Sequence, residues 1–174
     1  VSAYCDLLKS GAVASGEKIN ICVPTGNFGN ILAAFYAREM GLPVKKLICA
    51  SNENKVLTDF IRTGVYDRNR SFRTTISPSM DILISSNLER LLYTLSCRND
   101  DAVRSYMDSL RSGGRYTVST EIRDRLQAVF WGGFCDDRRT REVIERVWRE
   151  ENYLIDTHTA VAFDVLSQYR AETG

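Results

Sequence analysis

The sequence predicts an α/β fold in which helices flank a mostly parallel β-sheet. Two short apolar runs rich in β-branched residues, 18–23 and 44–50, have the composition of buried strands. Each run is followed by a segment whose apolar residues recur at helical spacing. The order strand, helix, strand, helix favours parallel pairing through a right-handed crossover. At 174 residues the chain has the length of one domain, so we expect a single α/β domain or a fragment of one over 1–174.

The first strand and helix have well-marked boundaries. Pro24 follows the run KINICV and removes the next donor of a strand ladder. Apolar residues then recur at helical spacing from Asn30 to Met40, and Gly41 is well placed to end the helix. The second strand, 44–50, leads through a polar turn into a helix that ends at Gly64. The loop-rich sequence YDRNRSFRTTISPSMDI comes next.

Five more helices are predicted in the rest of the chain, and several of them are marked by a capping residue or by glycines that end them. The first begins near Ser86 or Asn87, the second runs from 100 to 110 before Gly113 and Gly114, and the third follows a cap at Ser119 or Thr120. The fourth covers the charged run 136–152, and the fifth begins near Asp156. In the charged run, Glu142 with Arg146 and Glu145 with Arg149 have the favourable order for ion pairs along a helix. This pattern is typical of a solvated face and argues against nucleic-acid binding there.

Composition excludes several classes of protein. The formal net charge is +1, so there is no bulk field to attract nucleic acid or an acidic membrane. No apolar run has the length needed to span a bilayer. The five cysteines are scattered without a CxxC pair, and only one histidine is present, so we expect no metal site and reduced thiols in a cytoplasmic protein. The chain begins within an amphipathic pattern, without methionine, and stops just after a predicted helix, which leads us to expect a fragment of a longer protein.

The stretch VPTGNFGN, residues 23–30, joins the first strand to the first long helix. A turn of this kind aims backbone N–H groups and the positive end of the helix dipole at one point, where an anion can bind without any lysine. Gly26 and Gly29 would allow positive φ and close approach to a phosphate, while Asn27 and Asn30 offer amide donors. A plain turn, with asparagines chosen for left-handed conformations, explains the spacing equally well.

Nucleotide motifs fit this stretch poorly. It is neither the GxxxxGK[ST] of a phosphate-binding loop nor the GxGxxG of a dinucleotide fold. A dinucleotide site would need an acid at the end of the second strand, and Glu53 stands at about that place. Because the glycine pattern is missing, a dinucleotide site is the weaker interpretation.

A family resemblance decides between the two interpretations of the turn. The run INICVPTGNFGNILAAFYAREMGLPVKKLICASNENKVLTDFIRTGVYDRN, followed by ISPSMDILISSNLERLLY, resembles the central part of threonine synthase, a pyridoxal-phosphate enzyme of the tryptophan synthase β-subunit fold group. The likeness is dense over 1–95 and returns in DTHTAVAFDVL, within the helix-rich remainder 96–174. It implies the three-layer fold of type II pyridoxal-phosphate enzymes.

The resemblance also implies a cofactor site. It makes residues 26–30 a cup that wraps the phosphate of pyridoxal phosphate, by way of Gly26, Asn27, Phe28, Gly29 and Asn30. The lysine that holds the cofactor as a Schiff base belongs to a segment upstream of this chain, so no catalytic residue is assigned. The run Ser71-Phe72-Arg73 imitates that lysine motif only superficially, because a guanidinium stays protonated and forms no imine.

The resemblance also points to a set of candidate residues on the substrate side of the site. Ser77, Ser79, Asp81, Asn87 and His158 are candidates to line it, but turn and helix-capping roles explain the same residues and are slightly favoured. His158 in particular stands in the first turn of a predicted helix, and in this family the lysine moves the protons.

The function implied is part of threonine synthase, which converts O-phosphohomoserine and water to threonine and phosphate. We expect the chain alone to be inactive, because the Schiff-base lysine is missing from it. Two alternatives remain: a noncatalytic threonine-synthase-like module that binds a phosphorylated ligand, and a dinucleotide-binding enzyme with a Rossmann-like unit.

Overall fold

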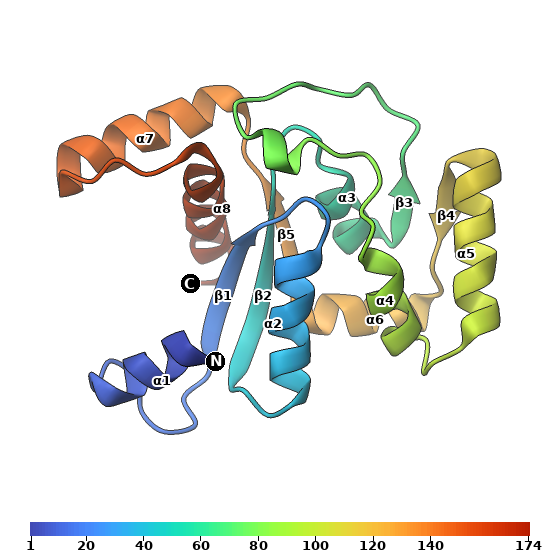
Figure 1. The fold of residues 1–174 in the computed structure, drawn as a ribbon, viewed down its shortest axis with the longest axis horizontal. Helices are drawn as coiled ribbons and strands as arrows, with labels where there is room; N and C mark the ends of the chain where they lie inside the picture. Colours follow the sequence, from blue (N-terminus) through green and yellow to red (C-terminus); the bar gives the residue numbers. More distant parts are fainter.

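The computed structural model describes residues 1–174 as five strands, eight α-helices and one short 3-10 helix (Figure 1). In chain order these are α1 Ser2–Lys9, β1 Ile19–Pro24, α2 Gly29–Glu39, β2 Val44–Ser51, α3 Val56–Thr63, β3 Val65–Asp67, η1 Pro78–Met80, α4 Leu88–Leu95, α5 Asp100–Gly113, β4 Arg115–Thr117, α6 Thr120–Val129, β5 Phe130–Phe134, α7 Asp137–Glu151 and α8 Thr157–Thr173.

The main sheet has three parallel strands in the order β1–β2–β5. Ile21 pairs with Leu47 across the first ladder, and Leu47 with Phe130 across the second. The prediction of an α/β fold with parallel strands is confirmed, as are the two strands expected near 18–23 and 44–50. Because β5 comes from the helix-rich remainder, that remainder contributes directly to the sheet that carries the glycine turn.

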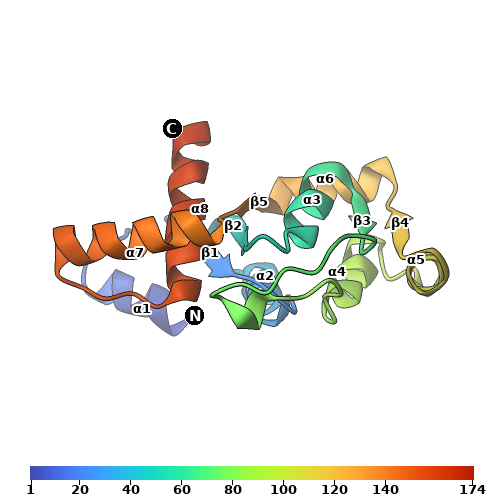
Figure 2. The same cartoon turned by 90° about the horizontal axis from the view of Figure 1, so that it is seen from above.

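Alternate residues of β2 face opposite sides of the sheet, as the pleat requires. Leu47 and Cys49 belong to the larger core cluster, which α2, α3, α4 and α6 complete. Ile48 and Ala50 belong to a second cluster, against α8. Figure 2 shows α8 on one side of the strands and α2 and α3 on the other. These are the three layers of helix, sheet and helix that the resemblance implied.

Strand β5 was missed by the sequence prediction because its centre is Gly132-Gly133, which has low strand propensity. The structure explains both glycines by close packing. A Cβ on Gly132 would lie 3.1 Å from the Cα of Thr58 in α3, and one on Gly133 would lie 2.9 Å from Val165 in α8. Glycine therefore lets one helix from each layer approach the third strand.

The short antiparallel pair β3–β4 is not predicted from the sequence, because each of its strands has only three residues. Its centre is Tyr66 opposite Tyr116, whose rings stack with centroids 5.3 Å apart. Phe60 of α3 meets both rings edge-on. Aromatic pairs of this kind stabilise a ladder that is too short to show a periodic pattern.

The predicted helix ends are largely confirmed. Gly64 and Gly114 take left-handed conformations at the ends of α3 and α5, and Ser119 and Asp156 cap α6 and α8 through their side chains. In α7, Arg149 pairs with Glu145 at 2.6 Å, as expected.

The other predicted pair in α7, between Glu142 and Arg146, is wrong. Glu142 pairs instead with Arg138 at 2.6 Å, and the guanidinium of Arg146 lies over the ring of Phe163 in α8. None of the helices is both long and apolar enough to cross a membrane.

Candidate anion site at the β1–α2 turn

A cleft of about 400 Å³ opens where the parallel strands end. One unbroken run, residues 23–31, forms most of its lining, and Ser79, Met80 and His158 complete it. Figure 1 shows the turn after β1 and the start of α8 at this same edge of the sheet. Ligand sites of open α/β sheets commonly lie at this edge, beyond the carboxyl ends of the strands.

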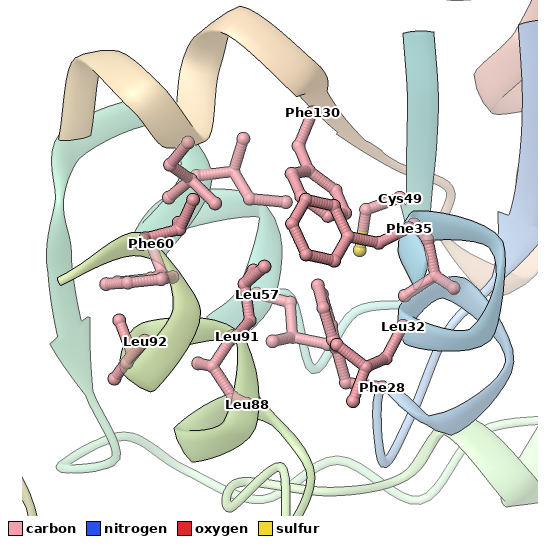
Figure 3. Packing of buried hydrophobic residues seen from close by; sticks show 14 of the residues in the cluster. Phe28, Leu32, Phe35, Cys49, Leu57, Phe60, Leu88, Leu91, Leu92 and Phe130 are labelled. Atoms are coloured by element: carbon pink, nitrogen blue, oxygen red, sulfur yellow. The ribbon is translucent and has the colours of Figure 1, made fainter. Parts of the chain in front are cut away.

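The turn is made by a left-handed phenylalanine. Phe28 has φ 65° and ψ 8°, and it stands immediately before the first residue of α2. Gly26 and Gly29 do not have positive φ, so the expectation that they supply the left-handed backbone is wrong, as is the left-handed role considered for the asparagines. The reason lies in the core: the Phe28 ring is 1% exposed and packs 5.6 Å from the Phe130 ring (Figure 3).

The two glycines of the loop are needed for different reasons. A Cβ on Gly26 would lie 2.5 Å from the carbonyl oxygen of Ser79, which is closer than any side chain tolerates. A Cβ on Gly29 would meet only the Asn87 amide nitrogen, at an ordinary 3.7 Å. Gly26 is therefore fixed by the opposite wall of the cleft, whereas Gly29 has room for a side chain.

The backbone N–H groups of residues 26–31 make no hydrogen bond within the protein. The helix that follows has no side-chain cap, so the first-turn donors of α2 are among them. The side-chain amides of Asn27 and Asn30 are exposed and also have no partner in the chain. A run of free peptide donors beside a left-handed residue forms the concave arrangement that binds anions.

The carbonyl groups of the same loop are, in contrast, firmly held. The Ser85 hydroxyl donates to the Gly26 oxygen at 3.1 Å, and the Asn87 amide donates to the Asn27 oxygen at 2.7 Å. In a planar trans peptide the N–H points opposite to the C=O. Anchoring these two carbonyls on one side therefore turns the N–H groups of Asn27 and Phe28 to the other.

Segment 83–85 is itself fixed by Tyr66. The Tyr66 hydroxyl donates to the Leu83 oxygen at 3.1 Å and accepts the Ser85 N–H at 2.8 Å. Burial raises the pKa of Tyr66 to about 12, so the hydroxyl keeps its proton at neutral pH. Ser85 was not among the predicted site residues, because nothing in the sequence separates it from other turn serines.

The opposite wall brings two of the predicted residues, Ser79 and His158, to the cleft. The Ser79 N–H donates to Nε2 of His158 at 3.3 Å, and Nδ1 lies 3.3 Å from the Asp156 carboxylate. Asp156 caps α8 by accepting the N–H of His158, which confirms the capping part of the prediction. A hydrogen bond from the Thr159 hydroxyl is the main cause that holds the pKa of Asp156 below its usual range.

Ser77 and Asp81 do not line the cleft, although they were predicted beside Ser79. Asp81 accepts hydrogen bonds from the amides of Asn52 and Asn54 at 2.7 and 2.9 Å, and from the Thr75 hydroxyl at 2.8 Å. The Asn52 amide also reaches the Ser77 hydroxyl at 3.1 Å. This buried network joins the end of β2 to the segment that carries Ser79.

Asn87 does not fulfil its predicted capping role. It occupies the N-cap position of α4, but its side chain makes no capping hydrogen bond and reaches the loop carbonyl instead. Ser77, before η1, likewise makes no side-chain cap. Capping is therefore the wrong explanation for both side chains.

The lining of the cleft has no lysine, cysteine or carboxylate. None of the five lysines lines it: the Lys46 ammonium donates to the carbonyls of Gln127 and Ala128, and Lys55 lies over the Phe134 ring. Burial raises the pKa of the nearby Cys22 to about 12, which keeps its thiol protonated. No group of three or more His, Cys, Asp or Glu side chains is placed to hold a metal ion. What the lining does offer is a run of unpaired peptide donors, together with the exposed amides of Asn27 and Asn30.

Comparison with known proteins gives consistent relatives. The chain is 42% identical over 173 residues to "Threonine synthase-like 1" of Macaca fascicularis, and 41% identical over 157 residues to the threonine synthase of Eremothecium gossypii. These matches cover 99% and 83% of this chain. Among solved structures, pyridoxal-phosphate-bound threonine synthase from Brucella melitensis superposes with a TM-score of 0.89 at 37% identity, over 95% of this chain.

The chain spans only part of each relative: 23% of the Macaca protein, 31% of the Eremothecium protein and 35% of the Brucella chain. No family model matches the sequence. These relatives favour neither of the alternatives raised by the sequence. Glu53, which a dinucleotide site would need, is absent from the lining of the cleft.

Proposed function

We propose, from the premise that this chain is a segment of the threonine synthase family, that the loop 26–30 and the start of α2 hold the phosphate of pyridoxal phosphate. The observation that carries the proposal is the run of unpaired N–H groups from residue 26 to 31. Peptide donors at a helix start bind a phosphate through hydrogen bonds and the helix dipole together. Gly26, Asn27, Phe28, Gly29 and Asn30 would each contribute a donor.

The shape and charge of the cleft fit this group. Its volume of about 400 Å³ lies within the range of small-molecule sites, roughly 300–1,000 Å³. Gly26 allows the loop to approach the Ser79 wall closely, and no carboxylate lines the cleft to repel an anion. The lining also has no lysine or arginine, so peptide dipoles would carry the attraction.

His158 and Ser79 would form the far wall of the site. With Nε2 accepting the Ser79 N–H and Nδ1 beside Asp156, the imidazole is oriented by its neighbours on both sides. We infer a positioning role for His158, since both ring nitrogens are already engaged. Asn87 would act from behind the loop rather than against the substrate.

For the whole protein we propose the family reaction, conversion of O-phosphohomoserine and water to threonine and phosphate, in the cytoplasm. When bound, pyridoxal phosphate supplies an electron sink for negative charge at the substrate carbon. This chain's part is to bind and orient the phosphate end of the cofactor. Because none of its lysines lines the cleft, we infer that the chain alone does not convert the substrate.

Phosphate binding is tested most directly at Gly29, which lines the cleft and has room for a side chain. Gly29→Asp places a carboxylate beside the donors, and Gly29→Asn is its neutral control of the same shape. Calorimetric titration of the chain with inorganic phosphate and with pyridoxal phosphate should show binding that the Asp variant loses at least tenfold and the Asn variant largely keeps. Absence of binding to the unmodified chain, or equal affinities in the two variants, would refute the site.

The inference of inactivity has a separate test. Borohydride reduction after incubation with pyridoxal phosphate, followed by peptide mapping, reports any lysine that forms an imine. We expect at most scattered labelling. Stoichiometric labelling of one of the five lysines would overturn the inference.

A further inference from the structure

The side chain of Asn87 is committed to the carbonyl group of Asn27. Its Nδ2 donates to that oxygen at 2.7 Å, and its backbone N–H donates to the same oxygen at 3.2 Å. An asparagine at an N-cap ordinarily accepts an N–H from its own helix, but here that bond is not made. Two donors thus converge on a single peptide of the glycine loop.

Arg90, one turn into α4, sets the orientation of this amide. Its Nη1 donates to Oδ1 of Asn87, which leaves Nδ2 for the loop carbonyl. Arg90 forms no ion pair, and its side chain is exposed. Its positive charge is therefore not neutralised by a neighbouring carboxylate in direct contact.

The connection continues through the peptide itself. The Asn27 oxygen and the Phe28 N–H belong to the same planar unit and point in opposite directions. Hydrogen bonds in series polarise one another, and a charged first donor strengthens the effect. A cation outside the cleft is thereby coupled to an N–H inside it, although the lining contains no lysine or arginine.

We propose that Asn87 and Arg90 are positioning residues that orient and polarise the Asn27–Phe28 peptide for phosphate binding, with Arg90 acting through Asn87. The inference rests on the proposed function of the loop. Helix α4 would thus affect anion binding without contacting the ligand. The plain alternative is a local pairing of residues 87 and 90 on a helix surface, which would leave ligand affinity unchanged.

A double-mutant cycle in the 174-residue chain separates the two explanations. The variants are Asn87→Ala, Arg90→Ala and their combination, titrated calorimetrically with inorganic phosphate and with pyridoxal phosphate. We expect Asn87→Ala to weaken binding about tenfold and Arg90→Ala about threefold. Since Arg90 acts through Asn87, the double variant should be no weaker than Asn87→Ala alone.

Two further variants and one control distinguish charge, geometry and general damage. Arg90→Gln keeps a donor but not the charge, and Arg90→Lys keeps both, so the lysine variant should recover more of the affinity. Arg104→Ala removes an exposed arginine from α5, whose nearest carboxylate is 3.9 Å away, and should leave affinity unchanged. Thermal unfolding of each variant, without ligand, shows whether affinity changes separately from stability.

The outcomes also separate this inference from the function on which it rests. If the unmodified chain binds neither probe, the proposed function fails and the inference fails with it. If the unmodified chain binds but the Arg90 variants match it, or if the effects of the two single variants add, only the relay is refuted.

Discussion

The backbone of Phe28 destabilises the fold and its buried ring stabilises it, and mutation can separate these two contributions to the free energy of unfolding. Phe28→Ala removes a ring that is 1% exposed, which should destabilise the fold by about 3–5 kcal/mol. The alanine would also keep the left-handed conformation at φ 65°, which costs a non-glycine residue roughly 1–2 kcal/mol. Phe28→Gly loses the same ring but relieves that cost.

The expected order is therefore the reverse of the usual one. Glycine gains roughly 1–2 kcal/mol from the relieved backbone. It loses about 0.4–1 kcal/mol through the greater freedom of the unfolded chain. Phe28→Gly should thus be more stable than Phe28→Ala by about 0.5–1 kcal/mol, measured as a shift of the urea midpoint at constant slope.

Phe35 is the matched control, because it lies in the same core cluster on an ordinary helical backbone. In a helix interior glycine is worse than alanine by about 1 kcal/mol, so Phe35→Gly should be less stable than Phe35→Ala. If glycine is the less stable substitution at both positions by the same amount, the left-handed backbone at Phe28 carries no cost and the reasoning is wrong.

Three further predictions concern the cleft and the residues that support it. Gly26→Ala should cost about 1–3 kcal/mol and weaken phosphate binding, because its Cβ would lie 2.5 Å from the Ser79 oxygen, whereas Gly29→Ala should unfold at the temperature of the unmodified chain or above. Asp81→Ala should lower stability by about 3 kcal/mol in chemical denaturation, since it removes the acceptor of the Thr75 N–H and one acceptor each from the Thr75 hydroxyl and the Asn52 and Asn54 amides; a loss below about 0.5 kcal/mol would contradict this. The lowered pKa of Asp156 means that its stabilising effect is complete above the ordinary value of 3.8 and is lost as pH falls below it. Asp156→Asn should therefore reduce the dependence of the unfolding temperature on pH in that acid range only, and an unchanged acid profile would refute the assignment.

Much of the fold could be predicted because local patterns and tertiary structure agree. The apolar runs of β1 and β2 and the caps of α3, α6 and α8 need no information from distant residues. Strand β5 could not be found in this way, since Gly132 and Gly133 lower its propensity and are required only by helices packed from far along the chain. Tertiary packing overrides propensity there.

The candidate site, too, was predictable only where local sequence signals define it. The turn was found because its glycines and asparagines are local signals, and the family resemblance chose between a turn and an anion site. Which residue would take the left-handed conformation depended on a ring buried against Phe130, and the anchoring by Ser85 and Asn87 depended on a segment about 60 positions away. Contacts at that separation leave no pattern in a single sequence.

The donors that line the cleft belong to the main chain, and every residue except proline carries one. An alanine scan of residues 26–31 would leave each of those N–H groups in place and would therefore not detect the donors. The residues that the site requires are instead Gly26, where a Cβ would clash, Phe28, whose backbone is left-handed, and the residues that anchor the loop from behind. Side chains at the mouth could thus diverge widely between relatives while the ligand stays the same, and a search for matching polar residues would overlook the site.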